Sequence, residues 1–296
     1  MTEKEIYSFK QWLKGIPYEI AFWKSYYGHA DSLRDLDSWS EYGKECHLDN
    51  FDIKKFVESC PSIPRFVDLG CALSYTFGTK LDGIDIEIDR VDPLASFYNQ
   101  ILQKYAPNRP KIKYGMIECI SACYEKNSVD LIHVRNALDH CSDPILGIME
   151  CLECLRIEGV LYLNHHRNEA LREGYRGFHQ YNIDIEDGKL IIWKKDARID
   201  LNAFLADFST VECSVTDREE IVAVITKKSE LIEYNARKSK ERAMKMLNLA
   251  LQSFNSSSFS MRYHLDGIVA NIAHKTMRRI PRKLVERIKK SLSKSK

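Results

Sequence analysis

Short apolar runs alternate with stretches of helical periodicity through the middle of the chain. RFVDLG (65–70), GIDIEIDRVD (83–92), KIKYGMI (111–117), VDLIHVRNA (129–137) and VLYLNHH (160–166) predict five strands. The fourth is nearly continuous in apolar residues, as strands buried on both faces are. Because helical segments separate several of the strands, the pattern predicts an α/β fold with a mostly parallel sheet.

Two helices are expected between these strands. LASFYNQILQKYA (94–106) carries apolar residues at helical spacing, and PILGIMECLECLRI (144–157) does so until Gly159 ends it. The connection from the first strand to the second is short, so any helix there must be abbreviated.

The end of the central region has a different pattern. A hairpin is expected around Asp187-Gly188, followed by a helix near 200–207. TVECSVT (210–216) and EIVAVITK (220–227) read as strands joined by a few polar residues. Because so short a join allows only an antiparallel pair, the sheet is expected to have an antiparallel last strand.

The chain divides into three expected regions. Residues 1–62 form a helical cap rich in Trp and Tyr, with an amphipathic stretch at 19–28. Residues 63–227 form a Rossmann-like domain, and residues 228–296 form a basic helical extension.

Charge sets the extension apart. The chain has a formal net charge of +2, which is made of +13 in residues 227–296 and −11 in residues 1–226. Its last segment, 278–296, carries an apolar stripe among Lys and Arg, as interfacial helices do. Peripheral contact with a membrane and docking on the acidic domain or a partner both remain open, whereas nucleic-acid binding is not expected because no recognised module is present.

Composition and cysteine usage favour a cytoplasmic protein. The N-terminal residues contain acids and lack the apolar core of a secretory signal. Nine cysteines, an odd number scattered through expected core elements, indicate reduced thiols rather than a disulfide framework. Cys151 and Cys154 form a CxxC inside a helical pattern without a second ligand pair, so buried packing is a better interpretation than zinc.

The first chemical signal is VDLGCALS (67–74) at the end of the first strand. The bend at Gly70 would let backbone N–H groups approach a ligand. Asp92, 22 residues further on, could accept hydrogen bonds from ribose hydroxyls, or could cap the helix that follows Pro93. The bend is not GxGxxG, which disfavours a dinucleotide ligand.

These features resemble class I S-adenosylmethionine-dependent methyltransferases. VDLGC matches their first motif, Asp92 their ribose-binding acid, and the terminal strand pair the end of their sheet. The resemblance implies S-adenosyl-L-methionine as cofactor, and it places the adenine near Ile117 and Glu118. It directs the segment from Asn136 to His140 toward the methionine part and the substrate. The implied cofactor-binding residues are Asp68, Gly70, Cys71, Asp92, Ile117, Glu118 and Asn136.

A closer resemblance covers residues 19–200. The strings EIAFWKSYY, VDPLASFYN, RNALDHCSDP and HHRNEALREGYRGFHQYN are similar to a bacterial methyltransferase subfamily associated with capsule and lipopolysaccharide biosynthesis. That subfamily usually has a second glycine where Ala72 stands. The resemblance implies O-methylation of a surface-polysaccharide precursor, with a glycan or nucleotide-sugar type of acceptor.

Candidate catalytic bases lie after the fourth and fifth strands. His140 ranks first, followed by His165 or His166, because histidine suits proton transfer near neutral pH. No HxH or HExxH arrangement is present, so no metal is expected. The polar and aromatic segment 167–182 suits sugar or phosphate recognition. The expected substrate-binding residues are Asp139, Asn168, Glu169, Tyr175, His179, Gln180 and Asn182.

Two other functions remain open at this point. A nicotinamide-dependent nucleotide-sugar oxidoreductase would use the same crevice, and a non-catalytic nucleoside-binding protein would retain the pocket without turnover.

Overall fold

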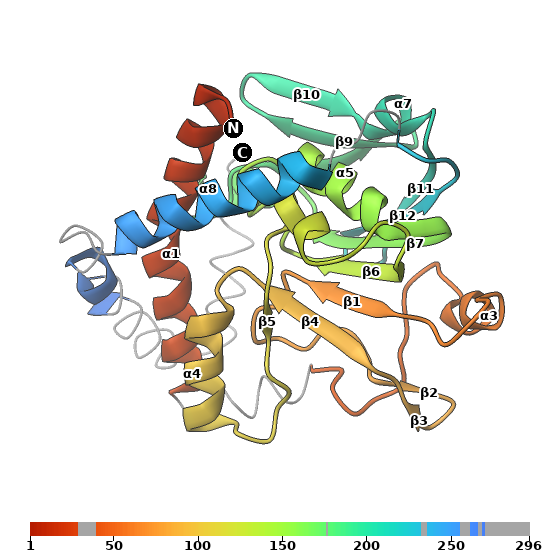
Figure 1. Cartoon of the computed structure of the whole chain (residues 1–296), viewed down its shortest axis with the longest axis horizontal. Coiled ribbons are helices and arrows are strands. Elements are labelled where there is room, and N and C mark those ends of the chain that lie inside the picture. Colours follow the sequence, from red (N-terminus) through yellow and green to blue (C-terminus); the bar gives the residue numbers. More distant parts are fainter. Residues whose placement is uncertain (29–39, 176, 232–235, 255–260, 266–267, 270–296) are drawn as a thin grey trace.

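A seven-stranded sheet with helices on its faces forms the centre of the protein (Figure 1). The computed structural model describes residues 1–28, 40–175, 177–231, 236–254, 261–265 and 268–269. The basic segment 278–296 lies outside the described residues, so its membrane contact stays a prediction. Among the described helices, none is long and apolar enough to cross a membrane.

The strand order confirms the predicted Rossmann-like sheet. Neighbouring pairs among β5, β4, β1, β6 and β7 are parallel, whereas β12 runs antiparallel between β7 and β11. The strands in spatial order are β5 (Lys113–Tyr114), β4 (Ile88–Asp92), β1 (Phe66–Leu69), β6 (Val129–Arg135), β7 (Leu155–His166), β12 (Glu220–Lys227) and β11 (Ser209–Val215). The antiparallel last strand therefore lies inside the sheet, and β11 forms the edge.

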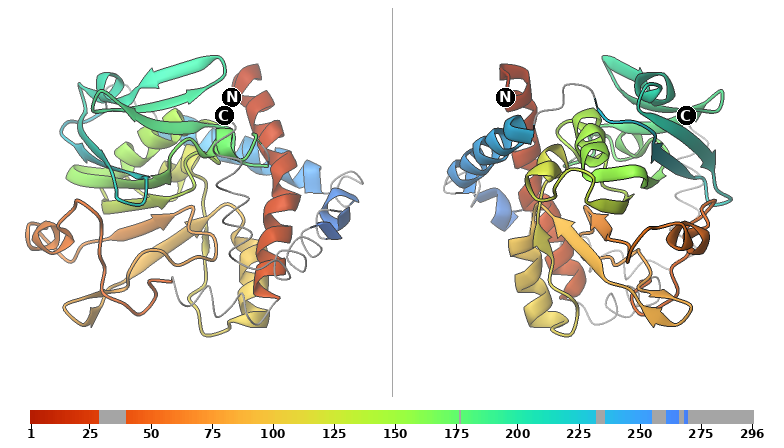
Figure 2. Two further views of the ribbon diagram at one scale, coloured as in Figure 1. Left: turned by 180° about the vertical axis from the view of Figure 1, so that it is seen from behind. Right: turned by 45° about the vertical axis from the view of Figure 1, so that its right-hand side comes forward.

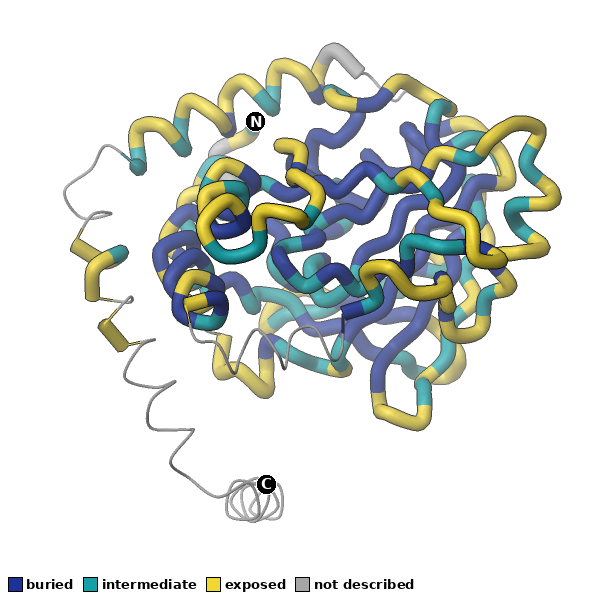
Figure 3. Tube along the Cα trace, turned by 90° about the horizontal axis from the view of Figure 1, so that it is seen from below, coloured by how far each residue is buried: buried dark blue, intermediate teal, exposed yellow. Residues whose placement is uncertain are grey.

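Alternating side chains bury both faces of this sheet. Val67 and Ile132 belong to the core that includes α5 (Pro144–Cys154), whereas Phe66 and Leu131 belong to the core next to α3 (Ile53–Glu58). This period of two is what a pleated strand imposes. Figure 3 shows the buried strands enclosed by more exposed outer elements.

Two predicted strands are shorter than the apolar runs suggest. Residues 83–92 divide into β3 (Ile84–Asp85) and β4, and β3 pairs with β2 (Lys80–Leu81) in a small hairpin outside the main sheet. The run at 111–117 contributes only β5, because a 3₁₀ helix, η1 (Ile117–Ala122), begins at Ile117. As the short connection suggested, no helix lies between β1 and β4.

The predicted helix at 144–157 ends three residues early. α5 stops at Cys154 and β7 begins at Leu155, which pairs with Val129 of β6. Arg156 Nε also contacts Asp130 Oδ1 at 2.5 Å. Sheet pairing and this ion pair therefore outweigh the local helical periodicity at the end of α5.

The hairpin at Asp187-Gly188 is confirmed. Its two residues have φ of 49° and 75°, and they join β8 (Asn182–Glu186) to β9 (Lys189–Lys194). The sequence did not predict β10 (Ala197–Asp200), which extends this hairpin into a three-stranded sheet. The helix expected near 200–207 is α7 (Leu201–Leu205).

The long N-terminal helix, α1 (Glu3–Tyr27), covers the bend after β1. It begins with a capping box between Thr2 and Glu5. Its buried side chains recur at helical spacing and share a core with Leu73 and with α4 (Ala95–Tyr105). The views in Figure 2 show α1 alongside α4. α1 therefore packs beside the bend in a fold whose β1–β4 connection has no helix of its own.

One end of α8 (Ala236–Phe254) is held to the domain by a buried carboxylate. Arg242 Nη1 lies 2.8 Å from Oε1 of the fully buried Glu150 and donates to the backbone oxygen of Glu118 at 3.0 Å. Ser239 Oγ and the backbone N–H of Ser121 donate to Oε2 of Glu150. Much of the remaining surface of α8 is exposed (Figure 3).

The nine cysteines are all free. Cys151 and Cys154 are buried within α5 and belong to the main hydrophobic core, which confirms that they act as small apolar residues.

Replacing Arg242 with Met should destabilise the protein by about 3 kcal/mol, because the Glu150 carboxylate loses its cation while it stays buried. Urea unfolding followed by circular dichroism measures the change. Lys240→Met is the control, because Lys240 is an exposed residue of the same helix. Equal unfolding free energies for the two variants would contradict the anchoring role of Arg242.

Candidate functional site

A cavity of about 910 Å³ opens at the carboxyl ends of the parallel strands. In open α/β sheets, ligands bind in this crevice. Its lining brings together Gly70, Asp92, Ile117, Glu118, Asn136, His140, His166, Glu169 and His179 of the residues expected from the sequence. The other expected residues lie outside the lining, and their positions follow below.

The bend at Gly70 is sterically restricted. Gly70 has φ of +70°, and a Cβ there would lie 2.5 Å from the Cβ of Ala137. Its backbone N–H donates to the oxygen of Val91 at 2.8 Å. Only glycine tolerates both the positive φ and the close approach to Ala137 without a shift of neighbouring atoms. Ala72, two residues further along the bend, also adopts a positive φ of 42°.

Asp92 joins this bend to the start of α4. Its Oδ2 accepts from the backbone N–H of Ala72 at 3.0 Å, and its Oδ1 accepts from that of Leu94 at 2.7 Å. Burial raises the pKa of Asp92 to about 7, against the lowering effect of these two hydrogen bonds. Asp92 lines the cavity and its carboxyl group accepts from the first backbone N–H before α4, so both roles expected from the sequence are compatible with its position.

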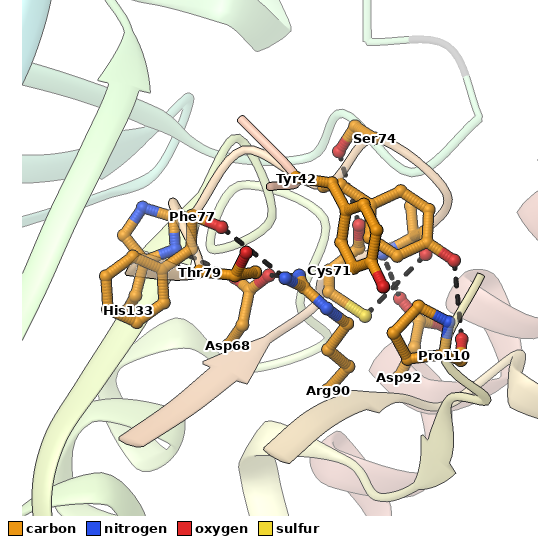
Figure 4. A network of polar contacts seen from close by, with 12 residues as sticks. Tyr42, Asp68, Cys71, Ser74, Phe77, Thr79, Arg90, Asp92, Pro110 and His133 are labelled. Carbon is orange, nitrogen blue, oxygen red and sulfur yellow. Dashed lines mark hydrogen bonds and ion pairs between the residues drawn. The ribbon is translucent and has the colours of Figure 1, made fainter. Parts of the chain in front are cut away.

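Asp68 and Cys71 are placed differently from the sequence-based expectation. Both are buried and neither lines the cavity. The Asp68 carboxylate accepts from Arg90 Nη1 at 2.7 Å and contacts His133 Nδ1 at 2.8 Å (Figure 4). Asp68 therefore connects β1 to β4 and β6 beneath the bend, and its carboxylate is already paired. The structure therefore gives Asp68 a role in joining strands, and its expected contact with the cofactor stays a prediction.

Glu118 lines the cavity and holds the residues that precede α5. Its Oε1 accepts from the backbone N–H and the hydroxyl of Ser142, both at 2.7 Å, and from the N–H of Asp143 at 3.3 Å. Burial raises the pKa of Glu118, although these hydrogen bonds oppose the shift. Met116 and Ile117 place apolar surface on the same part of the lining. This side suits a planar, largely apolar group such as a nucleobase.

The two candidate histidines at the end of β7 lie in different surroundings. His166 lines the cavity, and its backbone N–H donates to Oδ1 of Asn136 at 2.8 Å. His165 is buried outside the lining, and neither of its ring nitrogens has a hydrogen-bond partner in the described parts of the chain. Burial lowers the pKa of His165 to about 3. His165 is therefore removed from the candidate bases, because it does not reach the cavity.

His140, a lining residue of the cavity, lies close to two other polar side chains, those of His179 and Asp139. Its Nε2 lies 3.1 Å from Nδ1 of His179, and that nitrogen lies 2.8 Å from Oδ2 of Asp139. Burial favours the neutral form of Asp139, but His140 and His179 outweigh it and hold the pKa of this carboxyl below its usual range. Asp139 and His179 are 40 residues apart in sequence, so only the folded loops bring them together.

Some residues of the segment 167–182 line the cavity, and others hold the segment in its conformation. Glu169 and His179 line the cavity, and burial raises the pKa of Glu169 to about 7. The other expected substrate residues are Asn168, Tyr175, Gln180 and Asn182, none of which lies in the lining. Their side chains bond within this part of the fold: Asn182 Nδ2 donates to the Tyr175 hydroxyl at 3.0 Å, for example, and Asn168 Nδ2 to Asp184 Oδ2 at 2.6 Å. These four residues therefore shape the segment in this structure, and their expected contact with substrate stays a prediction.

Aromatic side chains line one part of the cavity that the sequence did not predict. This aromatic wall consists mainly of α1 side chains, and Trp12 stacks on Phe178 with ring centroids 5.0 Å apart. The amphipathic pattern at 19–28 indicated a buried face but not what that face covers. The missed lining residues include Trp12, Tyr18, Phe22, Trp23, Tyr26, Phe178, Arg135 and Arg218.

Comparisons with known proteins give distant structural similarity. No family model and no curated protein matches the chain. Solved structures that match 60% of this chain include the CurJ carbon methyltransferase (16% identity, TM-score 0.42) and the citrinin polyketide synthase CMeT domain (16%, 0.43). The chain spans about half the length of these two, at 52% and 51%. A methyltransferase from Clostridium acetobutylicum matches over 60% of this chain and 89% of its own length (12%, 0.38).

These identities and TM-scores are too low to transfer any role. The fold is therefore assigned from the strand order. The site is assigned from the arrangement of its residues.

Gly70→Ala should destabilise the protein by about 1–2 kcal/mol through its left-handed backbone, and by about 1–3 kcal/mol more through contact with Ala137. Gly83→Ala is the matched control, because Gly83 has φ of +77° and a Cβ there would meet no atom within 4 Å. Urea unfolding compares the two variants. Adding Ala137→Gly to Gly70→Ala should recover part of the loss, and equal stability of Gly70→Ala and Gly83→Ala would contradict the proposed clash.

Proposed function

We propose that this chain is an S-adenosylmethionine-dependent methyltransferase that methylates a hydroxyl oxygen of a polar small molecule. The observation that carries the proposal is the continuity of one cavity. Its lining includes the glycine bend and Asp92, and also the polar group His140, Glu169 and His179, which we call its polar end. A nucleoside can therefore occupy one end while an acceptor occupies the other.

The described residues fit the cofactor. The two oxygens of Asp92 each accept one backbone hydrogen bond, which leaves lone pairs for ribose hydroxyl donors. Met116 and Ile117 would contact the base, and the bend at Gly70 would lie against the rest of the nucleoside. When bound, S-adenosylmethionine supplies an electrophilic methyl group on a sulfonium sulfur.

The chain must then align the acceptor and remove its proton. An oxygen lone pair of the acceptor forms a bond to the methyl carbon while the carbon–sulfur bond breaks. Alignment of this kind can lower the barrier by about 7–11 kcal/mol. Glu169 takes the hydroxyl proton in this proposal, because it lines the polar end, whereas Nε2 of His140 faces His179 and Asp139.

More specifically, we propose that the acceptor is a glycan or a nucleotide sugar. This proposal rests on the sequence resemblance, with support from the lining chemistry. Aromatic rings from α1 can contact the apolar faces of sugars, and Arg135 and Arg218 offer donors to phosphate.

S-adenosylhomocysteine should bind the purified chain, and Asp92→Asn should weaken that binding by about 10-fold or more, because one ribose hydrogen bond to a charged acceptor is worth about 1.5–3 kcal/mol. Isothermal titration calorimetry measures both affinities. Asp85→Asn is the control on the exposed hairpin strand β3.

The same titration separates the alternatives. Because the pKa of Asp92 is about 7 and hydroxyl donors favour the carboxylate, binding should tighten from pH 6 to pH 8. Binding of NAD or NADP in place of S-adenosylhomocysteine would favour the oxidoreductase. No binding of any nucleoside at millimolar concentration would contradict the proposed function.

Methyl-labelled S-adenosylmethionine should transfer its label to at least one member of a nucleotide-sugar panel. With that acceptor, Glu169→Gln should lower kcat by about 10²–10⁴-fold while the affinity for S-adenosylhomocysteine stays unchanged, because only proton removal is lost. Glu173→Gln is the control, since Glu173 also lines the cavity. Equal kcat for the two variants would exclude Glu169 as the base, and no labelled product would contradict the glycan acceptor.

A further inference from the structure

Asp139, His140 and His179 bring three ligand-type atoms together at the polar end of the cavity. His179 Nδ1 lies 2.8 Å from Asp139 Oδ2, His140 Nε2 lies 3.1 Å from His179 Nδ1, and His140 Nε2 lies 3.6 Å from Asp139 Oδ2. Two of these residues come from the loop after β6, and the third comes from the segment after β7. We call these three residues the Asp-His-His cluster.

Hydrogen bonds alone satisfy this cluster poorly. A single N–H at Nδ1 of His179 can point fully at only one neighbour. If it points at Asp139, it leaves His140 Nε2 without a well-placed partner. If His140 instead donates to Nδ1 of His179, that nitrogen and the Asp139 oxygen become two acceptors held 2.8 Å apart.

A second observation points to a ligand. Asp139 is 3% exposed, and its Oδ1 has no hydrogen-bond partner among the described residues. A buried carboxylate oxygen without a donor is costly. The cluster therefore has spare acceptor capacity at a place where His140 and His179 line the cavity.

The spacing of the three atoms matches metal coordination. Ligand atoms about 2.1 Å from a divalent ion lie about 3.0 Å apart at neighbouring octahedral positions and about 3.4 Å apart in a tetrahedron. The observed separations of 2.8, 3.1 and 3.6 Å span these values. Two imidazoles and one carboxylate are also a ligand set of zinc and non-haem iron enzymes that keep positions open for substrate.

We propose that Asp139, His140 and His179 bind one divalent transition-metal ion of the zinc or ferrous type. This assignment revises the sequence-based expectation of no metal, which rested on the lack of a local HxH or HExxH pattern. Because the third ligand comes from a distant loop, no such pattern could reveal the site.

The role of the ion rests on the proposed function. The acceptor hydroxyl would coordinate an open position of the ion, which lowers the pKa of the hydroxyl. Its proton would pass to Glu169, and the oxygen lone pair would then form the bond to the methyl carbon as the carbon–sulfur bond breaks. The ion thus selects acceptors with a free hydroxyl and places that hydroxyl at the polar end of the cavity.

The test uses the full chain after chelator treatment and removal of the chelator, without any nucleoside. Titration with Co²⁺ should show one bound equivalent with the visible bands of nitrogen and oxygen ligation, and Zn²⁺ should displace it. His140→Ala and His179→Ala should each weaken the affinity by more than about 100-fold, because loss of an outer-sphere partner alone costs 10–100-fold. His166→Ala is the matched control, since His166 lines the same cavity outside the cluster.

Three results would overturn the proposal: no bound equivalent in the wild type, affinity unchanged in both cluster variants, or bands typical of thiolate ligation by the cysteines. The wild-type titration and the rise of its unfolding temperature with Zn²⁺ remain decisive if a variant fails to fold. Because S-adenosylhomocysteine binding is measured separately, failure of the metal site and failure of the methyltransferase assignment are distinguishable.

Discussion

The hydrogen bond from the backbone N–H of Ala72 to the carboxylate of Asp92 sets the geometry of the cavity, because it fixes the bend after β1 against the end of β4. Gly70 permits that bend through its positive φ and its close approach to Ala137. Beneath it, the paired carboxylate of Asp68 holds three adjacent strands together. The same contacts thus order the sheet and leave one buried acid, Asp92, in the lining of the cavity.

Much of the fold was predictable because the local signals agreed with the tertiary structure. Buried parallel strands are continuously apolar, and a short polar join such as that between 216 and 220 permits only an antiparallel turn. The errors occur where pairing outweighs periodicity. Leu155 continues a helical pattern, yet it pairs with β6, and no local signal encodes that partner.

The site was less predictable than the fold, because its members are joined by contacts between distant segments. Gly70 and Asp92 were recognisable because a fixed spacing relates them. The pairing of Asp68 was not predictable, since its partners Arg90 and His133 are buried polar residues that no motif identifies. The aromatic wall from α1 and the approach of His179 to Asp139 both depend on tertiary packing, which amphipathicity alone does not specify.

In the proposed function, a nucleoside binds at the glycine bend of the cavity and a hydroxyl acceptor binds at its polar end. The structure of the chain in complex with S-adenosylhomocysteine tests this assignment most directly. The account predicts ribose hydroxyls within hydrogen-bonding distance of Asp92 and a sulfur directed toward Glu169. A nucleoside bound elsewhere on the protein, or one whose ribose does not contact Asp92, would contradict it.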